Sequence, residues 1–212
     1  SERLSITTQF HVERTIRIIY GLPWKHDEVA RIFAPLPPPV IDGGRVHDDL
    51  LVHILVSKFA HHLPLYRLEE IAGAQGVELP RSSLADWVQA AAGFLKPVAD
   101  ALKAEALAAK VLHVDDTPVR QLDPGAGKCR TARFWTYRHA DGVWFDYTED
   151  RRGEHPATVL ADYDGLLVAD AYGGFDRIFK QGKALEIACW AHTRRKFFEA
   201  FDAGDHRADQ AL

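Results

Sequence analysis

The sequence predicts a mixed α/β (α+β) fold in which a helical segment precedes a five-stranded mixed sheet. Hydrophobic residues make up 47% of the 212 residues and charged residues 26%, the composition of an ordinary globular chain. Apolar side chains recur at helical spacing through residues 48–109. In residues 110–193, short apolar or aromatic runs alternate with helix-like segments, which predicts a sheet covered by helices.

Residues 1–47 precede these two segments. Apolar and polar residues alternate between Phe10 and Tyr20, and several of the apolar ones are β-branched, which predicts a strand or hairpin. Residues 35–47 contain four prolines and two glycines, which exclude a helix or a central strand. We therefore expect a linker at residues 35–47 that separates residues 1–34 from the rest of the chain.

Residues 48–109 are expected to be helical. Asp48 and Asp49 suit the first turn of a helix, because acidic side chains are favourable at a helix N-terminus. Pro64 begins a second helix, and Gly76 ends it. The expected helices start near residues 48, 64, 81 and 97, and the last of them is rich in alanine and leucine.

Residues 64–91 have the helix, glycine-centred turn and helix that are typical of a helix-turn-helix. Ser83 and Asp86 stand three residues apart, as in a capping box at the start of a helix. In a helix-turn-helix, Arg81, Ser82 and Ser83 would begin the recognition helix and contact DNA. The alternative is a helical hairpin that packs on the rest of the fold.

Residues 110–193 are expected to form the sheet. Asp141-Gly142 lies between two aromatic runs and predicts a tight hairpin turn. The predicted strands are 111–114, 133–138, 143–148, 165–169 and 184–191, and the predicted helices are 156–163 and from about 193 onward. The first three strands then form a meander, and the later ones join through helical crossovers. In this arrangement the first and fourth strands can be parallel neighbours.

Two of these strands are followed by an aspartate. Asp115 follows the first strand, and Asp170 follows the fourth. The carboxyl ends of neighbouring strands meet at one edge of an α/β sheet, so these side chains should converge. Converging carboxylates repel and require a cation, and Mg²⁺ bound there could assist phosphodiester chemistry. The alternative is that each aspartate suits a turn or a helix cap, which is the reading we favour for Asp116.

Charge and cysteine content limit the possible functions. The net charge of −4 argues against coating nucleic acid by bulk electrostatics, so DNA contacts should come from local patches. Cys129 and Cys189 stand 60 positions apart, and neither belongs to a Cys-x-x-Cys pair. This pattern excludes a disulfide scaffold and fits a reducing cytoplasm. No run is apolar and long enough for a membrane helix, and we expect no membrane partner.

Several longer motifs allow a more specific prediction of the fold and the function. They are VLHVDDTPV, FWTYR, EDRRGEHPATVLADYDGLLVADAYGGF and CWAHTRRKFFEA, with LLVHILVSKFAHHLPLYRLEEIAGAQGVELPRSSLADWV upstream. In this order they resemble the insertion sequence 66 transposase family, over about residues 35–201. The resemblance implies a ribonuclease H-like core, an Asp-Asp-Glu triad and Mg²⁺ or Mn²⁺. It also implies cytoplasmic action on DNA, both the ends of a mobile element and its target, by a homo-oligomer assembled on that DNA.

The resemblance assigns residues to the triad. Asp115 matches the first catalytic, metal-binding aspartate, in a segment that usually reads Asp-Glu-Thr, and Asp116 replaces its glutamate. Asp170 matches the second. The family's third acid, a glutamate, follows a helical insertion, and we expect residues 194–212 to begin that insertion. Glu199 is the nearest late glutamate and is more simply explained as a solvated helix-face residue.

The family usually carries a cysteine-rich zinc module before the proline linker. No cysteine lies near Tyr20–Trp24, where the second pair is expected, so residues 1–34 are interpreted as a diverged remnant without structural zinc. Two basic clusters are candidate DNA contacts, with a solvated surface as the alternative for each. They are Arg151 and Arg152 in a loop, and His192, Arg194, Arg195 and Lys196 at the start of a helix.

The sequence thus indicates a fragment of a DNA transposase that performs metal-dependent strand cleavage and strand transfer. The two alternatives are a non-catalytic DNA-binding remnant of a truncated mobile element and a ribonuclease H-like nuclease unrelated to transposition.

Overall fold

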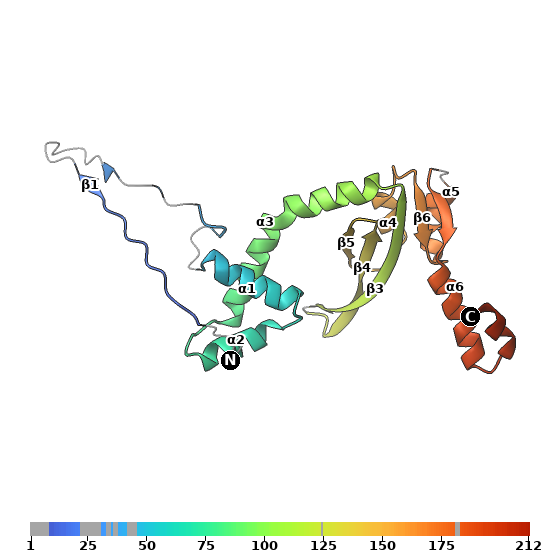
Figure 1. Ribbon diagram of the computed structural model, residues 1–212, viewed down its shortest axis with the longest axis horizontal. Coiled ribbons are helices and arrows are strands. Elements are labelled where there is room, and N and C mark those ends of the chain that lie inside the picture. The colour runs from blue at the N-terminus through green and yellow to red at the C-terminus, as the bar shows by residue number, and fades with distance from the viewer. Residues whose placement is uncertain are drawn as a thin grey trace, which may run out of the picture. The chain divides into compact units, whose positions relative to one another are not determined.

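The computed structural model describes residues 9–21, 31–32, 35, 38–41, 46–123, 125–180 and 183–212. The chain divides into two compact units, one that ends at Lys96 and one that begins at Pro97. Figure 1 shows the elements of each unit along the chain. Within the described residues, no helix combines the length and the apolar composition needed to cross a membrane.

The described N-terminal residues contain little regular structure. Strand β1 (Tyr20–Gly21) pairs antiparallel with β2 (Arg31–Ile32), and residues 9–19 are neither helix nor strand. The strand or hairpin predicted around Phe10–Tyr20 is therefore wrong for residues 10–19, and antiparallel pairing begins only at Tyr20. The side chain of Val12 is 94% exposed, so the alternating pattern has no core to pack against. Leu22–Trp24, and residues 36–37 and 42–45 of the proline linker, lie outside the described residues.

The helices of the first unit follow the prediction closely. Helix α1 (Asp48–Phe59) has His47 as its N-cap, and the His47 imidazole accepts a hydrogen bond from the Asp49 backbone N–H at 3.3 Å. Helix α2 (Leu65–Ala74) ends before Gly76, whose φ of +79° suits only a residue without a side chain. Ile54, Leu68 and Leu84 form the buried core of this unit.

Helix α3 (Arg81–Ala108) differs from the prediction in two ways. It begins at Arg81, so Ser83 lies inside the first turn and the capping box with Asp86 is not formed. The carboxylate of Glu69 takes the capping role, because its Oε1 accepts from the Arg81 backbone N–H at 3.2 Å. The helix is also continuous through Pro97, where two helices had been expected.

The second unit is built on the predicted five-stranded mixed sheet, and the order of its strands is β5-β4-β3-β6-β7. Strands β3 (Val111–Asp123), β4 (Lys128–Arg138) and β5 (Val143–Thr148) form the expected antiparallel meander. Strand β6 (Leu166–Ala169) lies parallel to β3, and β7 (Leu185–Ala188) lies parallel to β6. The first and fourth strands of the sheet are thus parallel neighbours.

Strand β3 is 13 residues long, far longer than the predicted 111–114. It pairs with β6 only from Val111 to His113, but with β4 as far as Asp123. Pro118 is tolerated because the register with β6 has already ended there, which leaves one side of the strand without a ladder to complete. Asp115 therefore lies inside a strand, although it follows the end of the parallel pairing.

Short helices complete this unit. The helices are α4 (Glu154–Val159), α5 (Asp176–Lys180) and α6 (Trp190–Asp202), with 3₁₀ turns η1 (Gly173–Phe175) and η2 (His206–Ala211). Trp135 and Tyr137 of β4 are fully buried with Leu112 and Leu167, as expected of hairpin aromatics in a core. The indole N–H of Trp135 donates to the Thr148 hydroxyl at 2.8 Å, which satisfies its only polar atom.

Candidate active site

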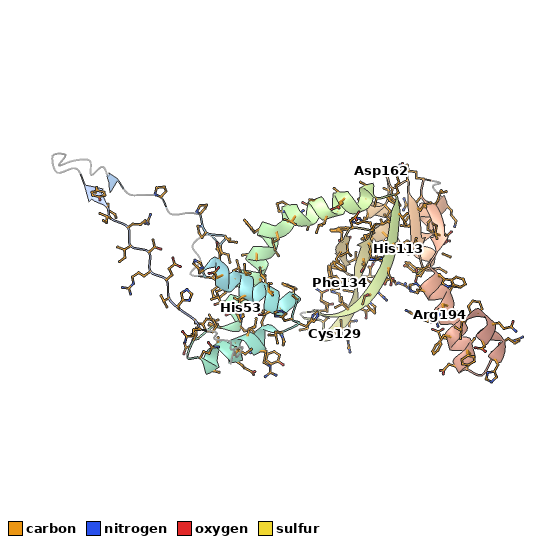
Figure 2. All side chains as sticks on the ribbon, in the orientation of Figure 1. His53, His113, Cys129, Phe134, Asp162 and Arg194 are labelled. Atoms are coloured by element: carbon orange, nitrogen blue, oxygen red, sulfur yellow. The ribbon has the colours of Figure 1, made fainter. Side chains whose placement is uncertain are left out.

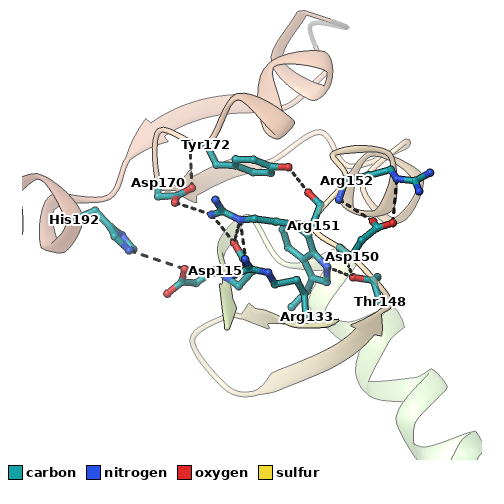
Figure 3. A network of polar contacts seen from close by, with 11 residues as sticks. Asp115, Arg133, Thr148, Asp150, Arg151, Arg152, Asp170, Tyr172 and His192 are labelled. Atoms are coloured by element: carbon teal, nitrogen blue, oxygen red, sulfur yellow. Dashed lines mark hydrogen bonds and ion pairs between the residues drawn. The ribbon is translucent and has the colours of Figure 1, made fainter. Parts of the chain in front are cut away.

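An open cavity of about 810 Å³ lies beyond the end of the parallel β3–β6 pairing. Its wall comes from the middle of β3, the loop before α4, strands β6 and β7 with the residues that follow them, and one side of α6. Among the lining residues are Asp115, Asp116, Arg151, Asp170, Tyr172, Glu186, His192, Arg195, Lys196 and Glu199. Figure 3 shows the polar contacts on one side of this cavity.

Asp115 lies two residues beyond His113, the last residue of β3 that pairs with β6. Its side chain is 58% exposed, and its Oδ1 accepts the backbone N–H of Asp116 at 2.9 Å. The Nε2 atom of His192 is 4.0 Å from the same oxygen. The carboxylate is therefore open to a ligand in the cavity.

Asp170 directly follows β6 and is 24% exposed. Its Oδ1 accepts the backbone N–H of Tyr172 at 3.1 Å, which fixes the orientation of the carboxylate. Its Oδ2 is 3.5 Å from Nη2 of Arg151. The structure thus brings both predicted aspartates to the same cavity, from two neighbouring parallel strands.

Asp116 does not belong to a turn or a cap, and our reading of this residue was wrong. Its side chain is only 2% exposed and pairs with two guanidinium groups, those of Arg133 and Arg151, at 2.8 and 2.7 Å. The sequence contained a signal: Leu112, Val114 and Asp116 alternate along one face of the strand, and the first two are buried. A carboxylate on a core-facing position requires a cationic partner.

Arg151 is held from two directions. Its Nε and Nη2 atoms both donate to Oδ1 of Asp116, at 2.9 and 2.7 Å, and these hydrogen bonds raise the pKa of Arg151 further above its usual value. Its guanidinium carbon lies 4.0 Å from the centre of the Tyr172 ring, and the Tyr172 hydroxyl donates to the Arg151 carbonyl. Arg152 instead pairs with Asp150 at 3.0 Å and is not among the cavity residues.

The basic residues of α6 are divided. His192, Arg195 and Lys196 line the cavity, whereas Arg194, labelled in Figure 2, is not among the lining residues. Lys196 pairs with Glu199 at 2.8 Å, and this hydrogen bond lowers the pKa of the Glu199 carboxyl. The Nδ1 atom of His192 is buried and has no hydrogen-bond partner among the described residues.

The candidate DNA contacts on α3 belong to the first unit. Arg81 pairs with Glu69 through its Nε at 3.2 Å, Ser82 is exposed and Ser83 is half-buried. In the described part of the chain, no three histidine, cysteine or acidic side chains gather closely enough to hold a metal ion.

Comparisons with known proteins agree with the motifs. The family model of the transposase IS66 family matches residues 43–212. The chain is 39% identical to the uncharacterized protein y4hP of Sinorhizobium fredii over 83% of its length, and 34% identical to y4jD of the same organism over 94%. It spans 34% and 42% of the length of these two relatives. Because the family model covers most of it, the chain belongs to the IS66 family of transposases.

Proposed function

We propose that this chain carries the metal-binding aspartates of a transposase that cleaves and joins DNA strands. The observation that supports it most strongly is the position of Asp115 and Asp170, on adjacent parallel strands and in the wall of one cavity. The sheet order, with an antiparallel meander followed by two parallel strands, supports a ribonuclease H-like assignment for this core.

The donor set suits a hard divalent cation. Mg²⁺ is commonly bound through one or two carboxylates and completes its coordination with water and substrate phosphates. Asp115 offers a half-exposed carboxylate, and Asp170 offers one that is already oriented by the Tyr172 backbone. Asp115 and Asp170 would therefore hold Mg²⁺ or Mn²⁺. The bound ion would supply an activated water and charge stabilisation for the leaving oxygen.

The neighbouring cationic residues would position the DNA. His192, Arg195 and Lys196 line the cavity on one side of α6, where they would contact phosphates next to the aspartates. Arg194 and Arg152 would contact the backbone farther from the cavity. Arg81, Ser82 and Ser83 at the start of α3 would bind DNA as a separate helical module, acting on element ends or target in a homo-oligomer in the cytoplasm.

A second candidate is a non-catalytic DNA-binding protein. It is favoured by the absence, among the described residues, of a third acid close enough to complete a metal cluster. The two candidates share the DNA contacts and differ only in strand cleavage, so one assay separates them.

The assay measures Mn²⁺-dependent nicking and strand joining on DNA that carries the element end. Asp115→Asn and Asp170→Asn are compared with Asp162→Asn, an exposed aspartate that does not line the cavity (Figure 2). Nicking that is lost in the first two variants and kept in the third supports the proposal. Nicking that survives both substitutions contradicts it. DNA binding without nicking by the unmodified chain favours the second candidate, and nicking without joining favours a nuclease.

A further inference from the structure

We propose that Arg151 competes with the divalent cation for Asp170, and that the buried carboxylate of Asp116 holds Arg151 in the competing position. This inference rests on the proposed metal site, and it adds to that site a residue that sets how tightly metal is held. None of the sequence motifs predicted this role, since Arg151 had been interpreted as a DNA contact.

A single nitrogen carries the competition. Nη2 of Arg151 lies 2.7 Å from Oδ1 of Asp116 and 3.5 Å from Oδ2 of Asp170. The bond to Asp116 is shorter, and Nε of the same guanidinium reinforces it at 2.9 Å. Arg151 is therefore anchored on Asp116, and from this position it also reaches Asp170. Figure 3 marks the contact between Arg151 and Asp170 with a dashed line.

The charges of Asp116 and its two arginine partners do not cancel. Asp116 is one anion between two cations, Arg133 and Arg151, and its side chain is 2% exposed. One positive charge therefore remains beside Asp170. A surface charge that is screened by salt would have little effect on metal affinity. The Arg151 charge, in contrast, is held in place by the buried Asp116 carboxylate and faces Oδ2 of Asp170, a carboxylate that we propose binds the metal.

Tyr172 couples the anchor to the aspartate. Its backbone N–H donates to Oδ1 of Asp170 at 3.1 Å, while its ring lies under the Arg151 guanidinium at 4.0 Å. Asp170 is thus oriented on one oxygen by Tyr172 and faces Arg151 with the other. A cation held by the Asp170 carboxylate would lie close to the guanidinium that contacts the same carboxylate at 3.5 Å, and like charges so close together repel.

Mn²⁺ affinity provides a direct test that does not depend on cleavage activity. Free Mn²⁺ is measured by electron paramagnetic resonance during titration of the whole chain. We expect Arg151→Gln to bind Mn²⁺ about three- to tenfold more tightly than the unmodified chain, because a repelling charge is removed. Arg151→Lys keeps the charge and should stay close to the unmodified affinity. Arg207→Gln is the matched control and should change nothing, because Arg207 pairs with Asp205 at 2.7 Å and does not line the cavity.

The substitution is expected to leave the fold intact. In Arg151→Gln the Asp116 carboxylate keeps its ion pair with Arg133 at 2.8 Å, so no buried charge is left alone. Circular dichroism of each variant checks this expectation. Equal or weaker Mn²⁺ binding by folded Arg151→Gln would overturn the inference and reduce Arg151 to a structural residue.

The failure of the inference can be told apart from the failure of the proposed function. Asp115→Asn and Asp170→Asn should both weaken Mn²⁺ binding if these residues hold the ion. If neither does, the proposed metal site is wrong, and the inference is wrong with it. If both weaken binding and Arg151→Gln does not strengthen it, only the inference is overturned.

Discussion

Asp115 and Asp116 are adjacent, chemically identical and in opposite environments, which makes them a matched pair for a stability measurement. The Asp116 carboxylate is 2% exposed and joins Arg133 to Arg151, whereas Asp115 is 58% exposed. Replacement by asparagine keeps the shape of each side chain, removes its charge and turns one acceptor oxygen into an N–H donor. Any difference between the two variants therefore reports the buried ion pairs.

The size of the effect follows from burial. Removing one partner of a fully buried ion pair costs about 3–5 kcal/mol, because the remaining charge is stranded. The side chains of Arg133 and Arg151 are 21% and 38% exposed, so water can partly solvate their charges after the substitution. We therefore expect Asp116→Asn to lower the free energy of unfolding by about 2–4 kcal/mol, and Asp115→Asn by less than about 0.5 kcal/mol.

The assay is urea unfolding followed by far-ultraviolet circular dichroism at neutral pH, with thermal unfolding as a second measure. For a unit of this size, the expected loss corresponds to a Tm lowered by about 8–15 °C for Asp116→Asn. A loss in Asp116→Asn no larger than that in Asp115→Asn would show that the two ion pairs contribute no net stability. The anchor proposed for Arg151 would then lose its physical basis.

Three further predictions test other parts of the structure. Burial raises the pKa of Tyr137, whose hydroxyl has no hydrogen-bond partner among the described residues. As the pH rises, the Tyr137 hydroxyl therefore loses its proton in the unfolded chain before it does so in the folded chain. The free energy of unfolding should therefore fall above about pH 10, and it should fall less steeply in Tyr137→Phe than in the unmodified chain. Urea unfolding of both proteins at pH 7 and pH 10.5 measures this difference. Gly153→Ala would place its Cβ 2.5 Å from the Gly174 carbonyl oxygen and should lower the Tm. A Cβ at Gly173 would meet nothing within 4 Å, so Gly173→Ala is the control and should have a higher Tm than Gly153→Ala. Leu84→Ala leaves a cavity at a fully buried position among the helices and should lower the free energy of unfolding in urea by about 2–5 kcal/mol. A loss under about 1 kcal/mol would show that Leu84 is not part of a packed core.

Much of the secondary structure could be predicted because its signals are local. Asp141-Gly142 lies in the turn between β4 and β5, and Gly76 follows the end of α2. A turn or a helix end depends on the backbone preferences of a few consecutive residues, which are visible in the sequence. The position of Asp170 directly after β6 was predictable for the same reason, since a short apolar run precedes it.

The alternating pattern between Phe10 and Tyr20 shows the limit of such signals. Alternation of apolar and polar residues indicates that one face of a strand could be buried, but a strand forms only where another strand pairs with it. In the described residues that pairing is confined to Tyr20–Gly21 with Arg31–Ile32. The length of β3 illustrates the converse, because pairing with β4 extends it through Asp115, Asp116 and Pro118 to Asp123.

The sequence by itself determined the order of the elements, the family and the two aspartates that line one cavity. Only the tertiary structure decided that Asp116 pairs with Arg151 and that Arg151 reaches Asp170, because these partners are 35 and 19 residues apart in the chain. Ion pairs depend on separation in space and on exclusion of water, and neither quantity exists until the strands have paired.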